Sequence, residues 1–296
     1  MTVSFDKLTQ QGLYLFNMYR ILSKVHKVTK FNSNPFFSTS CIPQEEKIKV
    51  GKYNINYIKV GTGPHNVLCM PGIFGTIWTD FKAQIEGFDR NKFTVITWDP
   101  PGYGKSRPPE KEFTLDFLEC DADYAYNFMK ALKIEKYSVL GWSAGGTTSV
   151  IHAAKYPDAM RKLVIWGTSS FILPHELKNY KNMNIMSNWS KSSYQAMTAI
   201  YGEENFAKYF SKFVDAAVGI YNKKNGNFCV ECLPDIKCPT FILHGKQDQL
   251  LDKFHASYFN KYIAESRSYI YPEGKHNIHI KYAEDFNKRV QEFLLE

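Results

Sequence analysis

The sequence lacks the features of a membrane protein, a zinc protein or a disulfide-rich secreted protein. In 296 residues no apolar run approaches the roughly 20 residues that a membrane-spanning helix needs. The six cysteines follow no disulfide-scaffold spacing. The pair Cys229 and Cys232 has no second pair or histidine cluster near it in sequence, as a zinc site would require. We therefore expect reduced thiols, no metal, no organic cofactor and no membrane span.

Acidic residues are missing from positions 18–44, where basic residues recur among Ser, Thr, Asn and apolar positions. From residue 1 to 44, Asp6 is the single acid against five basic residues, so this segment holds half of the net charge of +8. A basic, acid-poor and Ser-rich segment is typical of an organelle transit peptide. We predict a mitochondrial transit peptide at 1–44. The alternative is a flexible leader on a cytoplasmic protein.

A basic stripe interleaved with aromatic residues is also missing from the rest of the chain. The remaining positive charge is therefore interpreted as solvated surface, and we expect no nucleic-acid partner. With 44% hydrophobic and 16% aromatic residues, positions 45–296 can bury a large core. We expect these residues to form one domain. A monomer is the favoured oligomeric state.

Short apolar runs recur along this domain. Two of them, at 48–50 and 53–60, alternate apolar and polar residues around a turn and predict a half-exposed antiparallel hairpin. Five further runs are almost continuously apolar, at 67–70, 93–98, 137–140, 163–166 and 240–243. Such runs are typical of strands buried on both faces, and helix-length segments separate them. The pattern predicts an α/β fold, with a mostly parallel sheet and helices on both faces.

One gap between strands is too long for a single crossover helix. About 70 residues separate the runs at 163–166 and 240–243. Helical segments are expected within it at 193–200 and 206–218. We predict a helical cap, inserted at about 171–235 over the carboxyl edge of the sheet.

The stretch Gly141-Trp142-Ser143-Ala144-Gly145 reads Gly-x-Ser-x-Gly. It directly follows an expected strand and precedes small residues at 146–154 that can form a helix. This is the arrangement of a nucleophile elbow, a sharp turn that exposes a serine hydroxyl above a parallel sheet. Glycine is expected on either side because the turn brings strand and helix close together. The pentapeptide alone recurs by chance. The expected strand before it and the expected helix after it are what make a nucleophile elbow the favoured interpretation.

Two more reactive residues follow expected strands. Asp248 comes after the run at 240–243, and His276 comes after the last expected strand, at 266–271. The order Ser, acid, His is that of an α/β-hydrolase triad. His276 would take the proton of Ser143, and Asp248 would fix the imidazole tautomer. His279 is the alternative base, and the capping of a helix near position 251 is the structural alternative for Asp248.

The negative charge that develops on an attacked carbonyl oxygen needs backbone donors. In this fold they come from the residue after the nucleophile and from the loop after an earlier strand. The first donor is the N–H of Ala144. The second is the N–H of Ile73, in the Gly-rich loop at 70–75.

Four motifs, one of which overlaps the elbow, carry a resemblance to a known family. They are Trp98-Asp99-Pro100 with Gly102-Tyr103-Gly104, Leu140-Gly141-Trp142-Ser143, Lys155-Tyr156-Pro157, and the stretch from Pro272 to His279 that reads PEGKHNIH. With these motifs, residues 48–296 resemble the biphenyl-hydrolase-like branch of the α/β-hydrolases. The resemblance implies a serine hydrolase of small carboxylic esters that uses the triad above without a cofactor. It also implies that some members carry a mitochondrial leader.

The chain departs from this branch directly after the nucleophile. The amino-acid-ester hydrolases that it resembles carry an acidic residue there, which holds the substrate's ammonium group, and this chain has Ala144. A buried ammonium needs a charged or strongly hydrogen-bonding partner. We therefore expect a small-molecule ester substrate and weaker preference for amino esters. Thioester hydrolysis, carbon–carbon bond hydrolysis and non-catalytic ligand binding remain as alternatives.

Overall fold

The computed structural model describes residues 43–189 and 191–296. The segment predicted as a transit peptide, 1–44, therefore lies outside the described residues except for Pro43 and Gln44. Within the described ranges, no helix has both the length and the apolar character needed to cross a bilayer.

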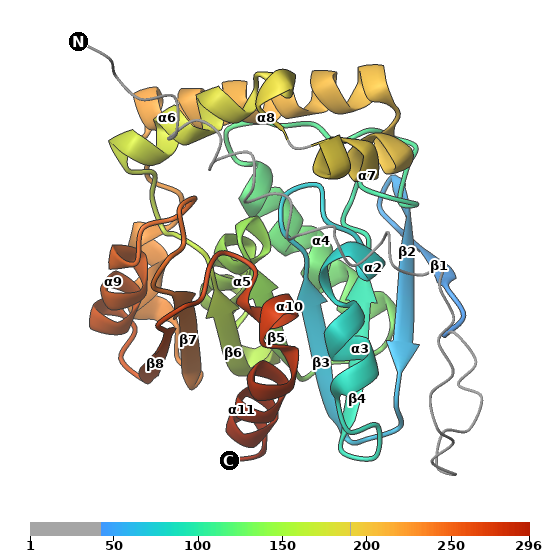
Figure 1. Cartoon of the computed structure of the whole chain (residues 1–296). Helices are drawn as coiled ribbons and strands as arrows, with labels where there is room; N and C mark the ends of the chain where they lie inside the picture. Colours follow the sequence, from blue (N-terminus) through green and yellow to red (C-terminus); the bar gives the residue numbers. More distant parts are fainter. Residues whose placement is uncertain (1–42, 190) are drawn as a thin grey trace, which may run out of the picture.

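Eight strands form one sheet in the order β1-β2-β4-β3-β5-β6-β7-β8 (Figure 1). Strands β1 and β2 form the antiparallel hairpin, and β2 also pairs antiparallel with β4. All other neighbours are parallel. The mostly parallel sheet is thus confirmed. The strands are β1 Glu46–Val50, β2 Tyr53–Val60, β3 His65–Met70, β4 Phe93–Trp98, β5 Tyr137–Trp142, β6 Met160–Trp166, β7 Thr240–Gly245 and β8 Ser266–Tyr271.

Helices cover both faces of the sheet, which explains the continuous apolar runs. On one face, Phe81, which directly precedes α3, and Phe286 of α11 pack in the same apolar cluster. Phe128, Ile151 and Phe259, from α4, α5 and α9, pack in the cluster on the other. The helices are α2 Ile77–Asp80, α3 Lys82–Gly87, α4 Phe117–Ala131, α5 Ala144–Lys155, α6 Pro174–Met183, α7 Lys191–Tyr201, α8 Glu203–Lys223, α9 Phe254–Tyr262, α10 Ile278–Lys281 and α11 Ala283–Leu295.

One strand is more buried than its alternating sequence suggested. Strand β2 was expected to be half exposed, but six of its eight residues are buried. The reason is that both faces of β2 are covered: Ile55 and Tyr57 pack in one core cluster, and Ile58 and Val60 pack in the other. Its Tyr57 packs edge-on against Phe128 of α4, with 5.5 Å between the ring centroids.

Helices α6, α7 and α8, called the cap helices below, lie between β6 and β7 in the chain. Figure 1 shows them across the top of the molecule, at one end of the strands. Helices α7 and α8 contain the two segments expected at 193–200 and 206–218 and extend beyond both. Aromatic residues fix α8 to the sheet edge. The ring centroids of Phe206 and Phe210 lie 5.9 Å and 5.8 Å from that of Phe74, in the loop after β3.

Candidate active site

Ser143 occupies a strained turn between β5 and α5. Its backbone angles are φ 54° and ψ −124°, a left-handed conformation that residues with a side chain rarely adopt. Two neighbouring glycines make the turn possible. A Cβ at Gly141 would lie 2.3 Å from the Ser149 hydroxyl, and one at Gly145 would lie 2.2 Å from the Met70 carbonyl oxygen. Larger residues at either position would push α5 away from the sheet.

The three residues of the predicted triad lie in hydrogen-bond contact. Nε2 of His276 is 3.1 Å from Oγ of Ser143, and Nδ1 of His276 is 2.8 Å from Oδ2 of Asp248. A carboxylate beside Nδ1 favours the tautomer with the proton on Nδ1. Nε2 then carries the lone pair that can accept the serine proton. The arrangement suits a serine nucleophile with a histidine base.

Asp248 is fully buried and fixed by its own loop. Its side chain is 0% exposed, and Oδ1 accepts hydrogen bonds from the amides of Leu250 and Leu251 at 2.9 Å and 3.2 Å. Burial raises the pKa of this carboxyl. His276, with smaller contributions from His244 and the Leu251 amide, outweighs burial and brings the pKa below its usual value. Asp248 thus shapes the turn after β7 while its second oxygen faces His276.

Trp142 holds the loop that carries His276. Its indole N–H donates to the carbonyl oxygen of His276 at 3.0 Å, and the two rings lie 5.2 Å apart. His279, the alternative base, instead accepts a hydrogen bond from the Trp166 indole at 2.9 Å. Burial lowers the pKa of His279 to about 3, so its ring is neutral. His279 is therefore part of the packed core.

The two amides expected to stabilise an oxyanion are free to do so. Within the described residues, neither the Ile73 N–H nor the Ala144 N–H donates a hydrogen bond. Ala144 begins α5, so its amide also benefits from the positive end of the helix dipole. The site therefore contains two donors that are not used by the fold.

Asp80 fixes the loop of Ile73 and was not predicted from the sequence. Its Oδ2 accepts a hydrogen bond from the Gly72 amide at 2.9 Å, and its Oδ1 accepts one from the Thr79 hydroxyl at 2.7 Å. Burial raises the pKa of Asp80 to about 7. A carboxyl eight residues after a loop glycine matches no motif, so the sequence contained no signal for this contact.

A cavity of about 110 Å³ opens above Ser143 and His276. Its walls are mainly apolar, and the cap helices supply many of them. Apolar residues that line it include Phe117, Trp189, Met197, Phe210 and Phe213. Asp80 is the one carboxylate among the described lining residues, and those residues include no lysine or arginine. The cavity therefore suits an uncharged, apolar group.

Known proteins resemble this chain over most of its length. A family model described as alpha/beta hydrolase fold matches residues 65–191. Serine hydrolase BPHL of Mus musculus is 39% identical over 273 residues, covering 88% of this chain and 94% of the mouse protein. Serine hydrolase BPHL of Homo sapiens is 42% identical over 248 residues, covering 84% of this chain and 85% of the human protein.

More distant proteins also match this chain. The 2-hydroxy-6-oxo-6-(2'-aminophenyl)hexa-2,4-dienoic acid hydrolase of Metapseudomonas resinovorans is 25% identical over 272 residues, covering 84% of this chain and 90% of that protein. Among solved structures, a serine hydrolase involved in carbazole degradation (CarC enzyme) matches with a TM-score of 0.69 and 21% identity. The match covers 86% of this chain and 99% of that chain.

Proposed function

This chain belongs to the α/β-hydrolase family, among the serine hydrolases related to BPHL, and from that premise we propose that it cleaves small, neutral carboxylic esters through an acyl intermediate on Ser143. The observation that carries the proposal is the continuous contact from Asp248 through His276 to Ser143, beside two free amides. The mostly apolar cavity above these groups gives the substrate class.

In the first half of the proposed reaction, Nε2 of His276 takes the proton of Ser143 as Oγ attacks the ester carbonyl. Asp248 stabilises the imidazolium that forms. The carbonyl oxygen becomes negative and is held by the amides of Ile73 and Ala144, which need no reorganisation at that moment. The protonated His276 then returns the proton to the departing alcohol, and the acyl group stays on Ser143.

In the second half, water replaces the alcohol. His276 takes a proton from water, the resulting hydroxide attacks the acyl carbonyl, and the same two amides hold the second oxyanion. Collapse returns the proton to Ser143 and releases a carboxylic acid. Residues of the cap helices form much of the cavity wall, and apolar walls strengthen the electrostatic contacts made in the cavity.

The neutral substrate follows from the walls of the cavity. A buried ammonium group would need an anionic partner, and the residue next to the nucleophile is Ala144. The carboxyl of Asp80 lines the cavity, but burial raises its pKa to about 7, so it is ionised less readily than an ordinary aspartate and is a weaker partner for a cation. We propose that acyl groups are short and apolar, because an apolar cavity of roughly 150 Å³ holds benzene and this one measures about 110 Å³.

Carbon–carbon bond hydrolysis is the second candidate, because the relative from Metapseudomonas resinovorans is named as a dienoic acid hydrolase. An acid of that kind carries a carboxylate, which needs a cationic partner when buried. Since no lysine or arginine occurs among the described lining residues, the neutral ester is favoured.

A panel of substrates on the purified chain tests the proposal. It contains neutral esters with acyl chains of increasing length, amino-acid esters, acyl thioesters and a dienoic acid. We expect the largest kcat/KM for a short neutral oxygen ester. Turnover of the dienoic acid or of a thioester with a larger kcat/KM than every oxygen ester would contradict the proposal.

A further inference from the structure

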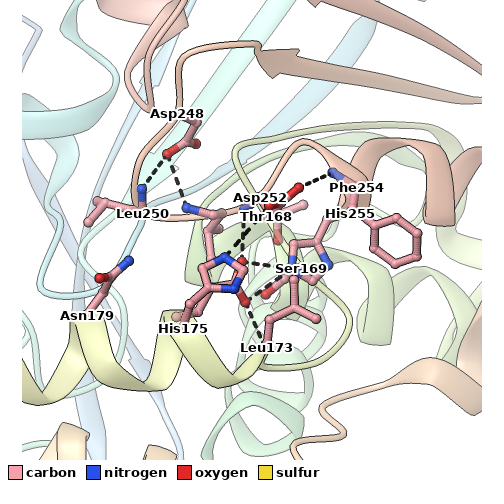
Figure 2. A network of polar contacts seen from close by, with 12 residues as sticks. Thr168, Ser169, Leu173, His175, Asn179, Asp248, Leu250, Asp252, Phe254 and His255 are labelled. Atoms are coloured by element: carbon pink, nitrogen blue, oxygen red, sulfur yellow. Dashed lines mark hydrogen bonds and ion pairs between the residues drawn. The ribbon is translucent and has the colours of Figure 1, made fainter.

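A buried carboxylate joins the cap helix α6 to the loop that carries Asp248. Glu176 of α6 and His255 of α9 have side chains that are 0% exposed, with 2.9 Å between Oε1 and Nε2. Oε1 also accepts a hydrogen bond from the amide of Asp252 at 2.8 Å. Oε2 accepts one from the amide of Leu173 at 2.9 Å. Figure 2 shows Leu173, Asp252, His255 and Asp248 in one network of polar contacts.

Capping of α6 explains only part of this arrangement. The bond from Leu173 satisfies a free amide at the start of α6, as a residue three positions into a helix often does. The bonds from Asp252 and His255 instead reach residues that follow β7, about 80 positions further along the chain. A buried carboxylate is tolerated because these donors converge on it. Glu176 is therefore a contact between the cap helices and the sheet domain.

The loop at 248–252 transmits this contact to the triad. Asp248 begins the loop, and the amides of Leu250 and Leu251 within the loop orient its carboxylate. At its end, the amide of Asp252 is held by Glu176. Asn179, also in α6, donates to the carbonyl oxygen of Gln249 at 3.1 Å. Helix α6 thus contacts the loop on both sides of the two amides that orient Asp248.

We propose that Glu176 and His255 are positioning residues for the triad acid. They hold the loop at 248–252 from α6, so that Asp248 faces His276 when the cap helices are docked. The inference rests on the proposed function, because it assigns Asp248 a role in the reaction. It adds that the cap helices complete the triad as well as forming walls of the substrate cavity.

Two variants test the proposal. Glu176→Ala leaves the amide of Asp252 and Nε2 of His255 without an acceptor, and His255→Phe removes one donor while keeping a ring. A misplacement of about 1 Å can cost about 100-fold in rate, so we expect kcat to fall about 10- to 100-fold in Glu176→Ala. KM should stay within about threefold, since transition-state geometry is lost rather than binding.

A spectroscopic readout separates positioning from simple destabilisation. The Nδ1 proton of His276, shared with Asp248, gives a downfield proton resonance while that hydrogen bond is intact. We expect this resonance to shift or broaden in Glu176→Ala and His255→Phe at temperatures where both remain folded. His255→Gln supplies an amide donor in place of Nε2 and should restore part of the lost kcat.

Lys224→Met is the matched control. Lys224, at the end of α8, donates to the carbonyl oxygen of Leu115 at 3.0 Å, which is a contact between cap helix and sheet domain away from the Asp248 loop. We expect the kcat of this variant within about twofold of wild type, as for most changed surface contacts. If Glu176→Ala does not fold, the two His255 variants carry the test.

The outcomes distinguish this inference from the proposed function. If a fluorophosphonate labels wild-type Ser143, the proposed function survives. If Glu176→Ala and His255→Phe are then labelled at the wild-type rate with an unchanged His276 resonance, the positioning role is wrong. If wild type is not labelled at all, the proposed function fails, and this inference fails with it.

Discussion

Nε2 of His276 lies 3.1 Å from Oγ of Ser143, although 133 positions separate the two residues in the chain. The parallel sheet produces this proximity, because Ser143 follows β5 and His276 follows β8 at the same edge. A proton can pass directly between these atoms. Trp142 holds the loop of His276, and Asp248 orients its imidazole, so both support this contact.

Asp248→Asn should lower kcat by about four orders of magnitude, as the equivalent change does in serine proteases. An amide cannot hold the imidazole in the correct tautomer or stabilise its cation as a carboxylate does. Steady-state kinetics on a neutral ester check this, with KM expected to change little. Asp123→Asn, a change in a carboxylate that pairs with Lys155 at the surface, is the control and should retain activity. Equal activities in the two variants would show that Asp248 has no part in the reaction.

Asp80 should make stability depend on pH. Burial raises its pKa from 3.8 to about 7, so the folded state holds this proton more tightly than the unfolded state. Between pH about 4 and about 7 the free energy of unfolding therefore falls as pH rises, by about 1.4 kcal/mol per unit from this group. In Asp80→Asn that fall should be absent.

Urea unfolding at a series of pH values measures the effect of Asp80. The other titrating groups are common to both proteins, so the difference between the two curves isolates Asp80. We expect the wild-type curve to descend more steeply toward pH 7 than the Asp80→Asn curve. Parallel curves would mean that the carboxyl of Asp80 titrates as it does in the unfolded chain.

Ala144→Asp should alter the choice between two matched esters. The wild type should hydrolyse an ester of 3-methylbutanoic acid at least as well as the corresponding valine ester, which adds an ammonium group. A hydrogen bond to a charged group is worth about 1.5–3 kcal/mol. The ratio of kcat/KM for the valine ester to kcat/KM for the 3-methylbutanoate ester should therefore be about 10- to 100-fold higher in the variant than in the wild type. The ratio of kcat/KM values measures this. A strong wild-type preference for the valine ester would contradict the proposed substrate class.

Lys111 and Asp121 form a buried ion pair, with side chains 5% and 10% exposed. Lys111→Met should destabilise the fold by about 3–5 kcal/mol, because it leaves the carboxylate of Asp121 buried without its partner. The double variant Lys111→Met with Asp121→Leu should regain most of that loss. Chemical unfolding of the three proteins checks this, and a loss under about 1 kcal/mol in Lys111→Met would refute it.

Much of the site could be predicted because local sequence determines it. The glycines around Ser143 are needed for a turn that is built within a few residues, so the pentapeptide and its flanking strand and helix were informative. Asp248 and His276 follow strands whose apolar runs were recognisable, and a parallel sheet brings such positions to one edge. The expected strand at 266–271 matches β8 residue for residue.

The parts that were missed depend on contacts between distant segments. Asp80 and Glu176 are acidic residues that sequence alone would place at the surface, and they are buried because amides from other segments converge on them. Helix α6 was not predicted, since its polar sequence offers no clear apolar stripe. Strand β2 alternates like an exposed strand, yet core clusters on both faces of the sheet bury its side chains.

Labelling with a fluorophosphonate, followed by peptide mapping, tests directly whether Ser143 is the nucleophile. We predict that the wild-type chain gains one covalent adduct, on Ser143, and loses its esterase activity in proportion. Ser143→Ala should take up no label and turn over esters about a millionfold more slowly, by analogy with serine proteases. An adduct on another residue, or ester turnover that persists in Ser143→Ala, would show that Ser143 is not the nucleophile.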